Sequence, residues 1–184
     1  MRDELMIFNE KRTLNGEAPI AFGIGLHSGN CSVGNMGSDR RFDYSILGDA
    51  VNLTSRLEGV CKIVDTDILS TREFREATSE LAWLDLGLIK VVGRSEATNV
   101  FALAGDNAML TSAFFGEWQK YHERMMLLYR SHNFSEAEKE ALLISETVPY
   151  KWQPLYQSFQ RRCNLLSISS VATDEEPIWI LSSK

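Results

Sequence analysis

Asn52 and Arg56 are two polar residues whose types and spacing could do chemistry. They stand four residues apart in the segment G-D-A-V-N-L-T-S-R-L-E at 48–58. Residues four apart on a helix share a face, and the apolar Leu53 and Leu57 point elsewhere. Taken alone, an asparagine and an arginine on one helix face are more often a solvated surface than a binding site. The pair therefore needs support from the residues around it.

Other catalytic and binding motifs are not indicated. The sequence contains no P-loop, nucleophile elbow, H-E-x-x-H motif or EF-hand loop. The glycine-rich segment does not follow the dinucleotide pattern G-x-G-x-x-G between a strand and a helix. We expect its glycines to let backbone approach either another backbone segment or a ligand. These glycines are Gly23, Gly25, Gly29, Gly34 and Gly37.

Alternating strands and helices are predicted for residues 1–105. This mixture predicts an α+β class with a mixed or mainly antiparallel sheet. Asp49 is the expected N-cap of the helix that carries Asn52. The expected strands are 20–27, 31–36, 42–47, 67–70, 82–92 and 98–104, and the expected helices are 1–13, 49–59 and 72–77.

Residues 106–184 have a different, helical pattern. Aromatic and other apolar residues recur at helical spacing from Phe114 to Leu128, Ser135 begins a capping box, and a third helix is expected over 155–166. We expect a small helical appendage that caps the sheet, with a helical-repeat unit as the alternative. The tail is expected to be an extended arm that docks through Trp179.

Three blocks of the first region resemble the catalytic domain of class III nucleotidyl cyclases, the adenylate and guanylate cyclases. They are G-I-G-L-H-S-G at 23–29, G-D-A-V-N-L-T-S-R-L-E at 48–58 and V-V-G-R-S-E at 91–96. The resemblance covers residues 1–104 well. The helical part is more weakly similar to the tail of bacterial sensor-linked adenylate cyclases. The fold implied is a partial ferredoxin-like cyclase domain followed by the helical appendage.

The resemblance also implies a reaction and roles for four residues. In the family, the ribose 3′-oxygen of ATP attacks the α-phosphorus and pyrophosphate leaves. By resemblance, Arg56 stabilises the charge that builds on the phosphoryl oxygens, and Asn52 orients the ribose. Arg94 matches a position that contacts the triphosphate, with a solvent-exposed turn residue as the alternative. Ser45 matches the position that reads the purine, and its hydroxyl favours ATP, hence cyclic AMP as product; an outward strand residue is the alternative.

The family uses two Mg²⁺ or Mn²⁺ ions, and this sequence does not show their ligands. The two metal aspartates and a purine-reading lysine would precede the helix at which the chain begins, and Asp43, Asp49, Asp65 and Asp67 do not match those positions. We therefore assign no metal ligand and expect the isolated chain to be inactive. It would supply one half of a site formed between two subunits, as in a homodimer. The alternative is a non-catalytic remnant that dimerises or binds partners.

The composition argues against nucleic acid as a partner and indicates where the protein is located. The 184 residues carry a net charge of −6, and neither half is basic, so nucleic acid is not an expected partner. No apolar run is long enough for a membrane span, so any membrane attachment would come from an upstream region. The three cysteines, Cys31, Cys61 and Cys163, form no C-x-x-C motif. They are expected to be small buried thiols in a reduced, cytoplasmic protein.

Overall fold

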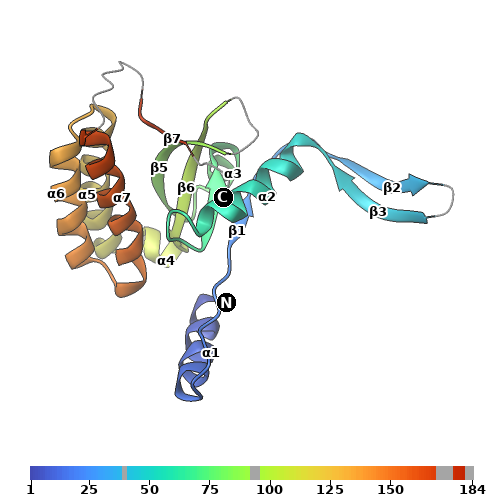
Figure 1. Ribbon diagram of the computed structural model, residues 1–184, viewed down its shortest axis with the longest axis horizontal. Helices are drawn as coiled ribbons and strands as arrows, with labels where there is room; N and C mark the ends of the chain where they lie inside the picture. Colours follow the sequence, from blue (N-terminus) through green and yellow to red (C-terminus); the bar gives the residue numbers. More distant parts are fainter. Residues whose placement is uncertain (39–40, 92–95, 169–175, 181–184) are drawn as a thin grey trace.

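Strands and helices alternate through the first 105 residues of the computed structural model, and helices dominate the rest (Figure 1). The structure describes residues 1–38, 41–91, 96–168 and 176–180. The helices are α1 (Arg2–Leu14), α2 (Asp49–Cys61), α3 (Arg72–Ala77), α4 (Asn107–Leu110), α5 (Ala113–Arg130), α6 (Phe134–Thr147) and α7 (Gln153–Ile168), with a 3-10 turn η1 (Tyr150–Trp152). The strands are β1 (Ile24–Leu26), β2 (Ser32–Ser38), β3 (Arg41–Leu47), β4 (Ile68–Thr71), β5 (Ala82–Lys90), β6 (Thr98–Gly105) and β7 (Ile178–Ile180).

The central sheet has five strands in the order β1-β4-β6-β5-β7. The inner pairs β4–β6 and β5–β6 are antiparallel, whereas the outer pairs β1–β4 and β5–β7 are parallel. The sheet is therefore mixed, and the predicted α+β class with a helical C-terminal part is confirmed. The strand expected at 20–27 joins the sheet only over the three residues of β1.

Helix α2 packs on β1 and β4 through an apolar stripe at helical spacing. Leu53 and Leu57 are 4% and 0% exposed, and Val60 and Cys61 are also buried. These side chains belong to one buried cluster that continues through β4, β5 and β6 into the helical part. Strand β6 ends at Gly105, and the buried core continues from the sheet into the helices that follow.

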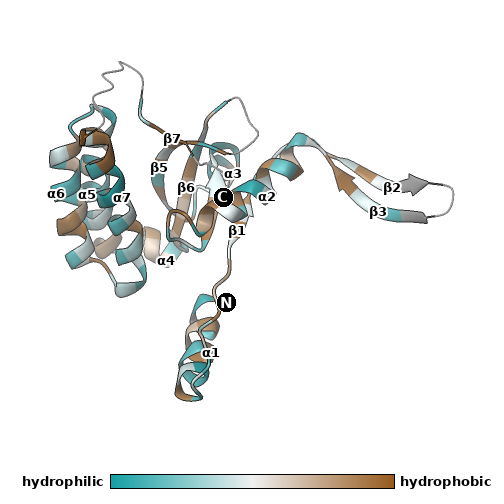
Figure 2. Cartoon of the chain, viewed as in Figure 1, coloured by the Kyte–Doolittle hydropathy of each residue, from teal (hydrophilic) through white to brown (hydrophobic). Residues whose placement is uncertain are grey.

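Two elements project from this core: α1, and the antiparallel hairpin formed by β2 and β3 (Figure 1). Both contain stretches coloured as hydrophobic in Figure 2. The side chains of Phe8, Tyr44 and Ile46 are 48%, 77% and 48% exposed. The first residue of α1, Arg2, makes an ion pair with Asp67 and donates a 2.7 Å hydrogen bond to the carbonyl of Leu103. The start of α1 is thus fixed to the sheet while its apolar side chains face outward.

Helices α5, α6 and α7, here called the helical unit, pack on one another, and α5 packs on β5. Helix α5 thus joins the helical C-terminal part to the sheet. The tail returns as β7, and Trp179 lies 5.8 Å from Phe159 of α7, so the expected docking of Trp179 is observed. No helix in the described ranges is both long and apolar enough to cross a bilayer.

Three local predictions are wrong. Helix α2 has Gly48 rather than Asp49 as its N-cap, because the chain turns there at φ 155°, a conformation that favours glycine. Helix α6 starts at Phe134, before the expected capping box at Ser135, and its N-cap is Asn133. Cys31 is exposed rather than buried, because it lies at the base of the projecting hairpin.

Candidate functional site

The turn from β3 into α2 places the predicted pair. Gly48 has φ 155°, and a Cβ there would be 3.1 Å from the carbonyl oxygen of Asn30. A larger residue is therefore disfavoured both by conformation and by space. The helix starts at once after this turn, so Asn52 lies one turn inside it and Arg56 one turn later.

Asn52 and Arg56, together called the Asn–Arg face, point away from the buried stripe of α2. Asn52 is exposed and Arg56 is half-buried, whereas Leu53 and Leu57 are buried. Within the described ranges, neither polar side chain has a hydrogen bond or ion pair with another residue. An amide and a guanidinium without protein partners retain their hydrogen-bonding capacity for an anionic, oxygen-rich ligand.

Ser45 lies on β3, where it pairs with Gly34 of β2 and is half-buried. The hairpin that carries it extends away from the sheet (Figure 1), and in the described part of the chain no hydrogen bond joins Ser45 to Asn52 or Arg56. The structure therefore brings Asn52 and Arg56 together, but it does not gather Ser45 with them in one pocket. Arg94 lies outside the described residues.

The carboxylates near this region do not fit a metal site. Asp67 is paired with Arg2, and Asp65 accepts hydrogen bonds of 2.7 Å from the Ser158 hydroxyl and 2.8 Å from Arg161. Across the described ranges, no group of three or more His, Cys, Asp or Glu side chains could hold a metal ion. The residues described here thus do not fit the pair of divalent ions that the sequence resemblance implies.

A histidine that sequence reasoning left unassigned lies beside the first turn of α2. The Nδ1 atom of His27 is 2.8 Å from the hydroxyl of Thr71 and 3.7 Å from the carboxylate of Glu73. The hydrogen bond from Thr71 holds the pKa of Glu73 below its usual value, with His27 a smaller contribution. A Cβ at Gly29 would be 2.8 Å from His27 Nε2 and 2.9 Å from Ala50 Cβ, so Gly29 lies next to both the ring and the start of α2.

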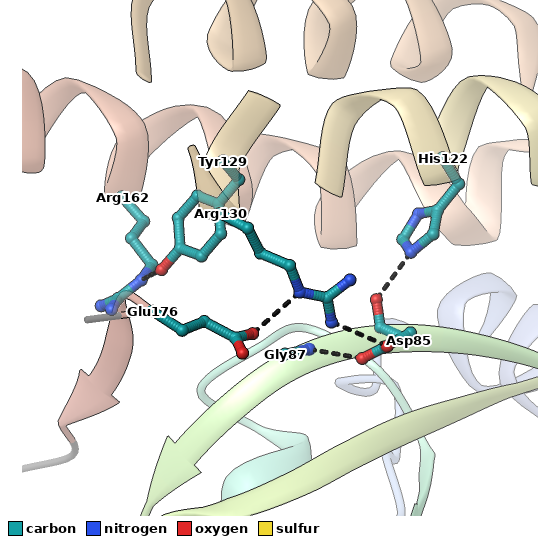
Figure 3. Close-up of polar contacts among 7 residues, drawn as sticks. All are labelled: Asp85, Gly87, His122, Tyr129, Arg130, Arg162 and Glu176. Carbon is teal, nitrogen blue, oxygen red and sulfur yellow. Dashed lines mark hydrogen bonds and ion pairs between the residues drawn. The ribbon is translucent and has the colours of Figure 1, made fainter. Parts of the chain in front are cut away.

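A second polar cluster joins the helical unit to the sheet (Figure 3). Arg130, at the end of α5, donates one 2.8 Å hydrogen bond to Asp85 of β5 and another to Glu176 in the tail. Asp85 also accepts a 2.8 Å hydrogen bond from the backbone N–H of Gly87, at a bulge where Gly87 has φ 79°. These contacts connect α5, β5 and the tail, and the charge of Arg130 is paired with the carboxylates of Asp85 and Glu176.

The buried side chains next to this cluster form a chain of hydrogen bonds. His122 Nε2 is 2.7 Å from the Asp85 carbonyl oxygen, which can only accept, so Nε2 carries the proton. His122 Nδ1 must then accept from the Tyr156 hydroxyl 3.0 Å away, and that hydroxyl accepts from Trp118 Nε1 at 2.5 Å. Burial lowers the pKa of His122 and keeps the ring neutral. Sequence reasoning treated His122 only as a surface or packing residue.

A groove of about 610 Å³ lies between α5 and the sheet, and its lining includes Trp83, Phe101, Lys120 and Arg130. No residue of α2 lines it. The groove therefore belongs to the junction with the helical unit and not to the Asn–Arg face.

Comparison with known proteins shows which family the sequence matches. The sequence model described as "Adenylate and Guanylate cyclase catalytic domain" matches residues 3–103. The chain is 30% identical over 106 residues to "Adenylate cyclase 1" of Rhizobium meliloti (strain 1021), covering 57% of this chain and 16% of that protein. It is 35% identical over 109 residues to "Adenylate cyclase" of Anabaena cylindrica, covering 55% of this chain and 22% of that protein.

Among solved structures, the adenylyl cyclase CyaB from P. aeruginosa is similar, with 29% identity and a TM-score of 0.50. That match covers 57% of this chain and 54% of the other. The chain spans about half the length of this solved structure and under a quarter of the two relatives. The family match ends within β6, so the helical unit lies beyond it.

Proposed function

The chain belongs to the adenylate and guanylate cyclase catalytic domain family, and on that premise we propose that it supplies one half of an adenylate cyclase site. The other half would come from a second subunit, so that the site is complete only between two chains. The observation that carries this proposal is the Asn–Arg face. Asn52 and Arg56 share one side of α2, are accessible, and have no protein partner in the described residues.

The proposed reaction forms 3′,5′-cyclic AMP from ATP. The ribose 3′-oxygen bonds to the α-phosphorus as its hydroxyl proton passes to water, the bond from the α-phosphorus to the α–β bridging oxygen breaks, and pyrophosphate leaves with that electron pair. Negative charge grows on the α-phosphoryl oxygens as this happens. Arg56 is proposed to hydrogen-bond those oxygens in the transition state, and Asn52 to orient the ribose. Arg94 is proposed to contact the triphosphate.

Ser45 is proposed to contact the purine and to favour ATP over GTP. Its hydroxyl can both donate and accept, and its half-buried place on β3 leaves it reachable from outside the chain. Competition between ATP and GTP in the assembled site tests this choice. Turnover of GTP equal to or faster than that of ATP would contradict it.

The described residues do not fit a metal site, so the second subunit is proposed to bring the carboxylates for Mg²⁺ or Mn²⁺ and the purine-reading lysine. A homodimer through the cyclase domain is proposed as well, but the described residues of both copies would lack a metal site, so the active assembly requires a subunit that carries the carboxylates. We place the protein in the cytoplasm, because ATP is available there and the three cysteines are free thiols.

The test is rescue of a defective partner. The full chain is co-expressed with a complete cyclase subunit whose own motif asparagine and arginine are replaced by alanine, with Mg²⁺ or Mn²⁺ supplied. Cyclic AMP is expected from the pair and not from either protein alone. Asn52→Ala should abolish the rescue, while Ser55→Ala on the exposed side of the same helix should preserve it. A folded pair without cyclic AMP would contradict the proposal.

The second candidate function is a non-catalytic module that dimerises or binds partners. The projecting elements favour it, since Phe8 of α1 and Tyr44 and Ile46 of the hairpin expose apolar surface. The same rescue assay separates the candidates. Such a module would associate with the partner subunit and leave its activity unrestored.

A further inference from the structure

Gly25 of strand β1 and Gly23, just before that strand, touch helix α2, and this contact bears on the function proposed above. We infer that Gly25, supported by Gly23, is a positioning residue for the Asn–Arg face. Because the inference rests on the proposed function, its test must distinguish a displaced helix from a wrong assignment of the site.

The approach of α2 to β1 at Gly25 is closer than a side chain permits. A Cβ at Gly25 would lie 2.2 Å from the carbonyl oxygen of Thr54, 2.8 Å from the backbone nitrogen of Glu58 and 2.9 Å from Leu57 Cβ. All three contacts are under 3.0 Å, and two of them are to helix backbone, which cannot rotate away. The absence of a side chain at this position therefore sets how near the helix lies.

Gly23 extends the same contact by one turn of the helix. A Cβ there would lie 2.9 Å from the carbonyl oxygen of Glu58 and 3.3 Å from Cys61 Cβ. Cys61 in turn lies close to β1, with its Sγ 3.6 Å from the carbonyl oxygen of Ile24. Two residues that are two apart in sequence, Gly23 and Gly25, thus face successive turns of α2.

The Asn–Arg face lies on the other side of the helix from this contact. At 3.6 residues per turn, Asn52 and Arg56 are roughly opposite Thr54 and Glu58. Any movement of α2 away from β1 therefore carries both side chains outward by the same distance. Restoring van der Waals separation around a Cβ at Gly25 needs a shift of roughly 1 Å, and misplacement by about 1 Å can reduce turnover about a hundredfold.

Two other glycines in this region lack such close neighbours. Gly59, on α2 itself, and Gly34, on the hairpin, would place a Cβ with nothing within 4 Å. Leu53 and Leu57 hold the helix to the core through apolar contact, which would tolerate a small shift. The backbone contact at Gly25, the shortest of those made with α2, therefore sets how closely the helix approaches β1.

The experiment compares Gly25→Ala with Gly59→Ala in the full chain. Crystal structures of both variants should show α2 moved by about 1 Å away from β1 in the first and unmoved in the second. In the rescue assay, kcat per folded chain should fall about a hundredfold for Gly25→Ala, with KM changed less than about threefold. Gly59→Ala should keep the wild-type kcat.

A double variant distinguishes positioning from a merely structural role. If Gly25→Ala acts by displacing Arg56, adding Arg56→Ala should reduce kcat little further, whereas independent effects would multiply. Gly23→Ala, with its milder contacts, serves the same comparison if Gly25→Ala does not fold. An unmoved α2, or multiplying effects, would overturn the inference. A wild-type chain that gives no rescue would instead contradict the proposed function, and the helix displacement would still decide the role of Gly25 in placing α2.

Discussion

The Asn–Arg face and the junction between α5 and β5 are both polar, but they differ in whether their polar side chains have hydrogen-bond partners within the protein. Asn52 and Arg56 have no side-chain partner in the described ranges. At the junction, Arg130 has two carboxylate partners and His122 has both ring nitrogens in hydrogen bonds. A scaffold satisfies its polar groups internally, whereas a binding surface keeps them for a ligand. Substitutions at the two regions should therefore separate activity from stability.

The largest expected effect is on turnover. Arg56→Ala should lower kcat of the rescued site about a hundredfold or more, with little change in KM, because a fixed positive charge acts mainly on the transition state. The melting temperature should stay the same, since Arg56 has no protein partner to lose. Lys62→Ala, at the exposed end of the same helix, is the matched control and should leave kcat unchanged. Loss of affinity at constant kcat would show that Arg56 binds the ground state instead.

The next effect is on stability. Tyr156→Phe removes the hydroxyl that bonds both Trp118 and His122 and leaves buried polar atoms unpartnered. The free energy of unfolding should fall by about 1–3 kcal/mol. Tyr150→Phe, at a side chain 84% exposed, should change it by less than about 0.5 kcal/mol. Denaturant unfolding measures both, and equal effects for the two variants would contradict the hydrogen-bond chain.

The same junction predicts a pH dependence. Burial lowers the pKa of His122 below its usual value, so the unfolded chain takes up a proton at higher pH than the folded chain. Stability from this group is fully present above about pH 6.5, the ordinary pKa of histidine. It should decline as pH falls towards the folded pKa, by up to about 1.4 kcal/mol per pH unit.

His122→Gln tests the assignment of this slope. A glutamine amide can donate to the Asp85 carbonyl and accept from Tyr156, but it does not titrate. Denaturant unfolding between pH 7.5 and 5 should show a shallower decline for the variant. An unchanged slope would assign the titration to other groups.

The smallest effect is expected at the edge of the junction. Glu176→Gln weakens the ion pair between Glu176 and Arg130. The two side chains are each about one-third exposed, Arg130 at 34% and Glu176 at 32%. Solvent screening limits the loss to about 0.2–1 kcal/mol. Glu146→Gln, an exposed acid of α6, is the control and should have no measurable effect. A loss as large as that of Tyr156→Phe would mean that the tail contributes to the core.

The two regions also differ in how far they can be predicted from the sequence. Asn52 and Arg56 lie in one continuous segment, and helical spacing alone puts them on a common face. The contacts of His122 join residues 34 and 37 apart in sequence, so no local pattern marks them. The sequence predicts that Gly23 and Gly25 let backbone approach either another backbone segment or a ligand, and only the packed helix identifies backbone as the neighbour. The N-cap at Asp49 was wrong because the φ of Gly48 is set by the turn out of β3.

The most direct test of the composite site is a titration. Increasing amounts of the purified chain are added to a fixed amount of the partner subunit that lacks its own asparagine and arginine, and the rate of cyclic AMP formation is measured. The predicted result is background activity from the chain alone and a rate that rises and saturates near one chain per partner subunit. A rate that follows the concentration of the chain without any partner would contradict the composite site.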